Sequence, residues 1–499
     1  MTQNPLENIQ RRPARERRVF PDPYYDETAL KPANLEADRV LRDAAVQVHV
    51  ARTIDSIEIR TIEKPEGVTA LEVLRALPED VVVRHHPLAG IEQALSAAGA
   101  GGALLAGAPE EVAVGAMRMV LRQRALEFSE AIVETRASIT DLAVGHLTTL
   151  ITATSNGQMV QPTTLAHYLT GQLGPLARTS QRLQQSYARL NRSPIGAASG
   201  MSTAVPMRRE RVASLLGFDG LIDHTFDAIA SADIEQELLA IVSAAAIETT
   251  RLVVDLTEWA RDDVGTIAPG DEFVHHGSAQ PQRRDPQALD HLRVRLARHA
   301  SAAHGLTTVL LGRSMLGSTA TRFETFFRVE QELAETIETY QLLSRVLGTL
   351  VVNRALTANR AHRGFATSSE LADLLAVDCG LPRDQAYALA ERIATEAMVL
   401  GLTGMTMDTK LVDKLALEVV GREVGIEPET LGKCLAVKRF VERREMVGGP
   451  APAAVRDSIE RESLSARRER SWITERRDAI SEAERVLREH VHSQVTGGT

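Results

Sequence analysis

Apolar residues recur at helical spacing over long stretches of this chain, and no other sequence feature limits its fold as strongly. One stretch runs from Glu110 to about Thr154, and a second begins at Ile234. A third forms a near-heptad stripe of Leu333, Ile337, Tyr340, Leu343, Leu347 and Leu350. Such stripes are typical of long helices packed side by side. Because alternation typical of strands is scarce, we expect a mainly α-helical fold with a long central bundle.

The composition is that of an ordinary globular protein with a large core. The 499 residues are 44% apolar and 25% charged, which suffices for two or three domains. The net charge of -9 provides no basic surface for nucleic acid or an anionic membrane. No apolar run approaches the roughly 18 residues needed to cross a bilayer. We therefore predict neither a nucleic-acid partner nor a membrane association.

The cysteines and the N-terminus indicate the cytoplasm. Cys379 and Cys434 lie far apart and form neither a CxxC pair nor a zinc-ligand spacing, so we expect both to be reduced. The N-terminal residues are polar and include acids and prolines, unlike a signal peptide. We predict a cytoplasmic protein with no bound metal.

Changes in helix length suggest four regions. After Arg363 the helical segments become shorter, and the last 40 or so residues are highly charged. We assign residues 1–110 to an N-terminal arm and small helical domain, 111–362 to the central bundle, 363–460 to a small C-terminal helical domain, and 461–499 to a charged helical tail. In the C-terminal domain we expect helices over residues 368–377, 382–400 and 408–424.

A polar loop at residues 271–286 separates two of the helical stretches. Prolines and glycines exclude a regular helix or a central strand there. Its reactive and charged side chains are His275, His276, Ser278, Arg283, Arg284 and Asp285. A mobile loop between long helices is a common position for acid/base and anion-binding groups. A solvated connector is the alternative.

Several segments together resemble argininosuccinate lyase, a member of the fumarase/aspartase superfamily. They are residues 161–167, 190–196, 212–220, 364–367 and 440–452, and the likeness runs from about residue 85 to 460. The polar loop falls where that family has its mobile signature loop. The resemblance implies a three-domain, mainly α subunit that forms a homotetramer and builds each active site from three subunits. It also implies a small-molecule substrate, cleavage of a C–N or C–O bond with release of fumarate, and no cofactor.

The first two polar motifs of the family are altered here. The motif that holds a substrate carboxylate corresponds to residues 107–113, where its hydrogen-bonding side chains are absent. In the second motif Ser155 and Gln158 remain as candidate substrate contacts, and Asn156 replaces a histidine. An amide can orient a substrate but cannot exchange a proton near neutral pH.

The third and fourth motifs are altered as well. The family's catalytic serine falls on Gly277, or on Ser278 if one residue is deleted. Arg283 replaces a lysine and remains able to bind a carboxylate, and Asp285 replaces an asparagine and would repel an anion unless an arginine pairs with it. Residues 314–322 retain only a terminal cation, Arg322. We therefore expect a substrate other than argininosuccinate.

Three hypotheses follow from these replacements. The first is a diverged lyase in specialised metabolism, with Ser278, His276 or His275 as catalytic groups and Arg283 or Arg284 holding a carboxylate. The second is a catalytically silent family member that acts as a binding or scaffold protein. The third is a cyclisation or condensation enzyme, because the small residues at 107–109 and 314–321 would open the site to a bulkier substrate.

Overall fold

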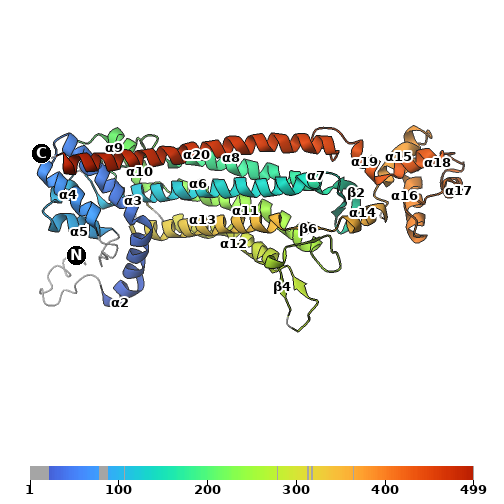
Figure 1. Cartoon of the computed structure of the whole chain (residues 1–499), viewed down its shortest axis with the longest axis horizontal. Coiled ribbons are helices and arrows are strands. Elements are labelled where there is room, and N and C mark those ends of the chain that lie inside the picture. The colour runs from blue at the N-terminus through green and yellow to red at the C-terminus, as the bar shows by residue number, and fades with distance from the viewer. Residues whose placement is uncertain are drawn as a thin grey trace, which may run out of the picture.

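The computed structural model describes residues 22–77, 88–105, 107–277, 279–311, 314–315, 319–363 and 365–497. Long helices lie side by side along the molecule, with smaller helical regions at both ends (Figure 1). The bundle helices are α6 (Pro109–Val144), α8 (Leu173–Leu190), α11 (Asp233–Trp259), α12 (Gln287–Leu310), α13 (Thr319–Gly348) and α20 (Pro452–Thr496). The predicted mainly α fold with a long central bundle is confirmed.

Helix α6 is the centre of the bundle because most of its circumference is buried. Leu126, Phe128, Ala131 and Val133 point in different directions around its axis, and all are buried. It packs against α3 (Lys31–Glu58), α8, α13 and α20. The Phe128 and Tyr340 rings meet at 5.6 Å between centroids, which joins α6 to the predicted stripe on α13. A helix that buries most of its circumference lies inside a bundle.

The expected extension of this helix to about Thr154 was wrong. Helix α6 ends at Val144, and the chain forms an antiparallel hairpin of β1 (Leu150–Ser155) and β2 (Gln158–Thr164). Threonine and isoleucine dominate residues 148–154. Their branched β-carbons lose rotamer freedom in a helix and fit a strand better. The helical spacing of the apolar residues did not reveal this change.

The two ends of the bundle carry different groups of short helices (Figure 1). The N-terminal end holds α4 (Lys64–Ala76), α5 (Ala89–Ala97), η3 (Gly101–Leu104), α9 (Arg209–Leu215) and α10 (Thr225–Ala230). The far end holds α7 (Leu165–Gly171), α14 (Arg354–Arg363), α15 (Ser368–Val377), α16 (Arg383–Val399), α17 (Thr409–Val420), α18 (Pro428–Leu435) and α19 (Val437–Glu442). Helices α15 to α18 share a core of their own. The bounds of α15, α16 and α17 lie within a few residues of those predicted from the sequence.

The charged tail is a helix, as expected, but it is not merely solvated. Helix α20 runs back along the bundle to the N-terminal end (Figure 1) and buries Ile459, Ile473, Leu487 and Val491. It is continuous across residues 460 and 461, where we placed the start of a separate tail. The division into four regions remains a prediction.

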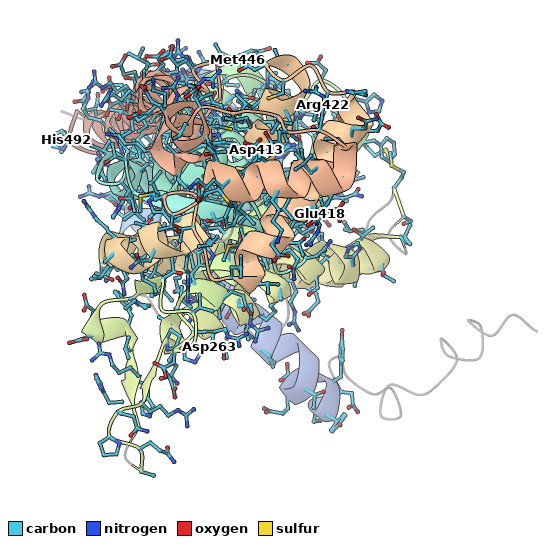
Figure 2. The ribbon with its side chains drawn as sticks, turned by 90° about the vertical axis from the view of Figure 1, so that its right-hand side faces the viewer. Asp263, Asp413, Glu418, Arg422, Met446 and His492 are labelled. Atoms are coloured by element: carbon cyan, nitrogen blue, oxygen red, sulfur yellow. The ribbon has the colours of Figure 1, made fainter. Side chains whose placement is uncertain are left out.

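The polar loop forms a short hairpin that leaves the bundle. Strand β4 (His275–His276) pairs with β5 (Arg284–Asp285), and Figures 1 and 2 show the hairpin projecting from the same side as α2 (Pro23–Tyr25). At its base β3 (Ile267–Ala268) pairs with β6 (Val351–Val352). Between α2 and α3 lies a π-helix, η2 (Asp26–Leu30). Across the described residues, no helix combines the length and apolar character that a membrane span requires.

Candidate active site

The β1–β2 hairpin presents the residues of the second altered motif in an exposed turn. Ser155 and Gln158 pair across the strands, and Asn156 and Gly157 form the two-residue connection with φ angles of 50° and 72°. Asn-Gly is a favoured pair in such turns because both positions require positive φ. Asn156 therefore has a backbone role, independent of any substrate.

Polar contacts tie this hairpin to the C-terminal end of the molecule. Gln161 Nε2 donates to Ser369 Oγ at 3.1 Å. His167 Nε2 lies 2.9 Å from the Gly448 carbonyl oxygen, and its Nδ1 lies 2.8 Å from Thr163 Oγ1. These contacts hold the turn against the loops around α15 and α19.

The β4–β5 hairpin separates the two candidate histidines. His275 lies opposite Asp285, and His276 lies opposite Arg284. Successive residues in a strand point to opposite faces, whereas directly opposed residues share a face. One face therefore carries His275 with Asp285, and the other carries His276 with Arg284. Only one histidine at a time can face a given substrate.

Ion pairs balance the charges of the hairpin. Arg283 Nε donates to Asp285 Oδ1 at 2.7 Å, which supplies the arginine that Asp285 needs in order not to repel an anion. Arg284 pairs with Asp271 at the base of the hairpin and lowers the pKa of that carboxyl. Gly277 also lies in the hairpin, and its N–H donates to the Arg283 carbonyl at 3.3 Å. Ser278 lies outside the described residues, so its catalytic role remains a prediction.

The space beside Gly107, the first of the small residues at 107–109, is not open. A methyl group added at Gly107 would overlap the guanidinium of Arg52, which comes from α3. Arg52 was not among the predicted site residues. The sequence did contain a feature that could have identified Arg52. It follows the apolar Leu41, Ala45 and Val48 at helical spacing, so its charged side chain lies on the buried face of the helix.

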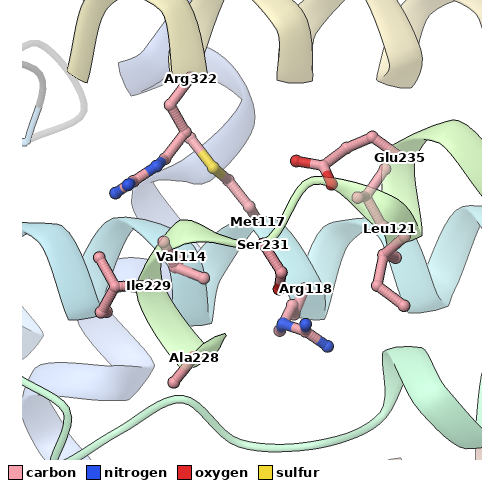
Figure 3. Close-up of a pocket in the computed structure, with 10 residues that line it drawn as sticks. Val114, Met117, Arg118, Leu121, Ala228, Ile229, Ser231, Glu235 and Arg322 are labelled. Atoms are coloured by element: carbon pink, nitrogen blue, oxygen red, sulfur yellow. The ribbon is translucent and has the colours of Figure 1, made fainter. Parts of the chain in front are cut away.

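Arg322 lies inside the bundle rather than with the hairpins. It is only 3% exposed and lines a cavity of about 20 Å³ with Arg118, Glu235 and Ser231 (Figure 3). Helix α12 leads from the β4–β5 hairpin to the loop before α13, and its 24 residues span about 36 Å at 1.5 Å each. Arg322 is thus separated from His275 and His276 by the length of a bundle helix.

A single chain therefore brings together only part of the predicted site. The β4–β5 hairpin gathers His275, His276, Arg283 and Arg284. The turn with Ser155, Asn156 and Gln158 lies at the far end of the bundle, apart from that hairpin (Figure 1). Among the described residues, no group of histidine, cysteine and carboxylate side chains is arranged to hold a metal ion. The available chemistry is proton transfer by imidazole and anion binding by guanidinium.

Comparisons with known proteins agree with this architecture. A family model described as lyase matches residues 110–298. The chain is 32% identical over 383 residues to the argininosuccinate lyase of Methanoculleus marisnigri, and the alignment covers 75% of each chain. The argininosuccinate lyase of Methanothermobacter thermautotrophicus is 30% identical over 348 residues, covering 69% of this chain and 73% of that enzyme.

Solved structures share the fold at lower identity. An EDDS lyase in complex with formate superposes with a TM-score of 0.84 at 24% identity, covering 95% of this chain and 99% of that one. The class II fumarase of Schistosoma mansoni superposes with a TM-score of 0.67 at 10% identity, covering 83% of this chain and 91% of that one. These similarities show the helical-bundle architecture. The reaction depends on the side chains of the site and not on the fold.

Proposed function

Since this chain belongs to the argininosuccinate lyase family of the fumarase/aspartase superfamily, we propose that it is a C–N or C–O lyase acting on a carboxylate-bearing substrate other than argininosuccinate. A base removes the proton next to a carboxylate, and the bond from the neighbouring carbon to nitrogen or oxygen breaks. The electron pair of the C–H bond becomes the new double bond. The pair of the broken bond stays on the nitrogen or oxygen, which takes up a proton, so fumarate and an amine or alcohol leave. The reverse reaction adds the amine or alcohol to fumarate.

The projecting β4–β5 hairpin is the observation that carries this proposal. It places His276 and Arg284 on one face, so a proton acceptor lies beside a guanidinium that also pairs with Asp271. Imidazole exchanges protons near neutral pH, and guanidinium binds a carboxylate through two parallel hydrogen bonds. Ser278 remains the alternative base. On the opposite face of the hairpin, His275 would be the proton acceptor and Arg283 the anion-binding group.

Two features support a substrate other than argininosuccinate. The Gly107 segment offers no side-chain hydrogen bond, and the space beside it is filled by Arg52. Arg322, the one retained cation of the fourth motif, is buried within the bundle. The first motif thus lacks the groups that would hold a substrate carboxylate, and the cation of the fourth motif lies away from both hairpins.

We further propose a homotetramer in which each site combines hairpins from several copies. Within one chain the β4–β5 hairpin projects away from the bundle that carries it. Helices α11 and α12 also expose apolar side chains, namely Ile247, Val254 and Val294. Contact with further copies would bury these side chains and bring the β1–β2 turn of one copy to the β4–β5 hairpin of another.

Turnover is tested by following fumarate through its ultraviolet absorbance. The purified protein is offered a panel of N-substituted aspartates that includes argininosuccinate, and separately fumarate with a panel of amines. We expect turnover of at least one member other than argininosuccinate. His276→Ala or Ser278→Ala should lower kcat about 10²- to 10⁴-fold, whichever is the base. Rapid cleavage of argininosuccinate, or no turnover with any pair, would refute the proposal.

Shared sites are tested by mixing two inactive variants. Gln158→Ala and His276→Ala subunits are unfolded together, refolded and assayed. If each site draws on several copies, mixed tetramers contain some sites with both native residues and regain part of the activity. If each site lies within one chain, mixing restores nothing.

A silent binding or scaffold protein is the second candidate. It is favoured by the backbone role of Asn156 and by the pairing of Arg283 with Asp285, which leaves that guanidinium less free to bind a substrate. A thermal-shift screen with dicarboxylates shows whether the hairpin binds such ligands, and the fumarate assay above separates the two candidates. Stabilisation by fumarate that His276→Ala and Arg284→Ala abolish, together with turnover, supports the enzyme, whereas stabilisation without turnover supports the binding protein.

A cyclisation or condensation enzyme is the third candidate. The hollow beside Met315, with a volume of about 320 Å³, is lined by His224, Phe226, Asp227 and Ser231 and is mostly apolar. Such a hollow suits an apolar substrate group, whereas the space beside Gly107 does not. Binding of apolar carboxylic acids in place of fumarate in the same screen would favour this candidate.

A further inference from the structure

The buried guanidinium of Arg52 fills the place where residue 107 would otherwise carry a side chain. A β-carbon built on Gly107 would overlap Nη1, Nη2 and Cζ of that arginine. Gly107 is not among the residues with positive φ, so its backbone would accept another amino acid. The position of the guanidinium therefore favours glycine there.

Several contacts hold the guanidinium in this place. Arg52 Nη2 donates to the Leu105 carbonyl oxygen at 3.0 Å, and Nε lies 3.7 Å from Glu111 Oε1. Glu111 is itself fixed, because its other carboxylate oxygen accepts the N–H groups of Gly196 at 2.9 Å and Ala198 at 2.7 Å. Arg52 and Glu111 are 2% and 0% exposed. A buried cation whose partner is anchored cannot swing away without separating two charges inside the protein.

We propose that Arg52 is a specificity-determining residue that plugs the site segment at 107–111 and excludes substrate groups from the space beside Gly107. The proposal rests on the proposed function in one respect, namely that this segment borders the substrate. Its consequence is that substrates must make their contacts at the two hairpins. At Gly107 the space that a side chain of residue 107 would take is filled by a side chain from α3.

A double-mutant cycle tests, without any assay of activity, whether the Arg52 guanidinium fills the space beside Gly107. Gly107→Ala should lower the Tm by several degrees, because the new methyl group meets a fixed guanidinium. Gly101→Ala is the matched control, since a β-carbon there has no atom within 4 Å. In an Arg52→Met background, where a flexible apolar chain replaces the guanidinium, Gly107→Ala should have no further effect. A neutral Gly107→Ala variant, or equal losses in both backgrounds, would overturn the proposal.

Chemical rescue provides a second test. Arg52→Ala should leave a cavity shaped for a planar cation beside Gly107 and Glu111. Millimolar guanidinium chloride should then raise the Tm of Arg52→Ala but not that of the unmodified protein, while urea and sodium chloride should raise neither. Equal responses of both proteins would contradict the plug. If Arg52→Ala does not fold, the comparison of Gly107→Ala with Gly101→Ala still shows whether the guanidinium fills the space beside Gly107.

The effect on specificity is read from the amine panel used above. With the plug removed, Arg52→Met should accept bulkier amines with fumarate than the unmodified protein does. An unchanged panel would refute the specificity role. If the unmodified protein shows no turnover at all, the proposed lyase function fails, whereas the result of the double-mutant cycle stands independently.

Discussion

Two buried ionisable side chains of neighbouring helices are accommodated in opposite ways. Arg136 of α6 is fully buried and pairs with Glu462 and Glu469 of α20. His49 of α3 is also buried, but burial and the nearby Arg52 charge lower its pKa to about 3. The arginine has two carboxylates beside it, whereas the histidine is neutral because burial and the Arg52 charge disfavour its charged form.

Replacing Arg136 by methionine should destabilise the protein strongly. The two carboxylates, each about one-tenth exposed, would lose their cation, and burial already raises the pKa of Glu462. Leaving such charges unpaired costs about 3–5 kcal/mol in the free energy of unfolding, measured by denaturant titration. As a control, Arg485→Met removes exposed pairs with Glu482 and Glu489 on the same helix and should change little. Equal effects would contradict this view of α20.

The neutral His49 should make stability fall in acid. The unfolded chain takes up a proton at His49 below the ordinary pKa of 6.5, whereas the folded protein does so only near pH 3. Acidification within this window therefore favours unfolding by up to about 1.4 kcal/mol per pH unit, and the contribution vanishes above pH 6.5. Between pH 7.5 and 5 the native protein should lose about 2 kcal/mol more than a His49→Leu variant. Parallel pH profiles of the two proteins would exclude this role.

At the scale of elements, α20 connects regions that are distant in the sequence. Its first half pairs with Arg136 of α6, and Arg477 binds Glu130 of α6 at 2.7 Å. Near its end, His490 Nε2 lies 2.9 Å from Arg211 of α9, beside Glu58 of α3. One helix thus links the core of the bundle to its N-terminal end.

Deleting residues 471–499 should loosen the N-terminal end selectively. The deletion removes Ile473, Leu487 and Val491, which are buried, and each such side chain contributes about 1.5–3 kcal/mol by leaving water. Hydrogen exchange should accelerate in α3 and α9, whereas α15 to α18, which have their own core, should keep their protection. Uniform acceleration, or an unchanged Tm, would show that α20 is not the link described here.

For the whole molecule, the exposed apolar face of α11 is expected to mediate association. Ile247 and Val254 are seven positions apart on one helix face and are 53% and 40% exposed. The double variant Ile247→Arg/Val254→Arg should place charges in the contact and reduce the mass measured by light scattering. Leu464→Arg is the control, because Leu464 is 57% exposed on α20. A single-chain mass for the unmodified protein would refute the homotetramer.

The sequence by itself determined the fold class, the bundle and the short C-terminal helices. These depend on local information, namely helical spacing of apolar residues and the glycines and prolines that interrupt it. Resemblance added the family and the position of the signature loop. The end of α6 was misjudged because the apolar spacing continued into threonine-rich residues that form β1.

Only the tertiary structure decided which side chains meet. It placed Arg52 beside Gly107, surrounded Arg136 with acids from α20, and put His275 and His276 on opposite faces of a hairpin. It also buried Arg322 in the bundle. Such contacts depend on how whole helices pack, and packing joins residues far apart in the chain through a balance of burial and charge that no local pattern records.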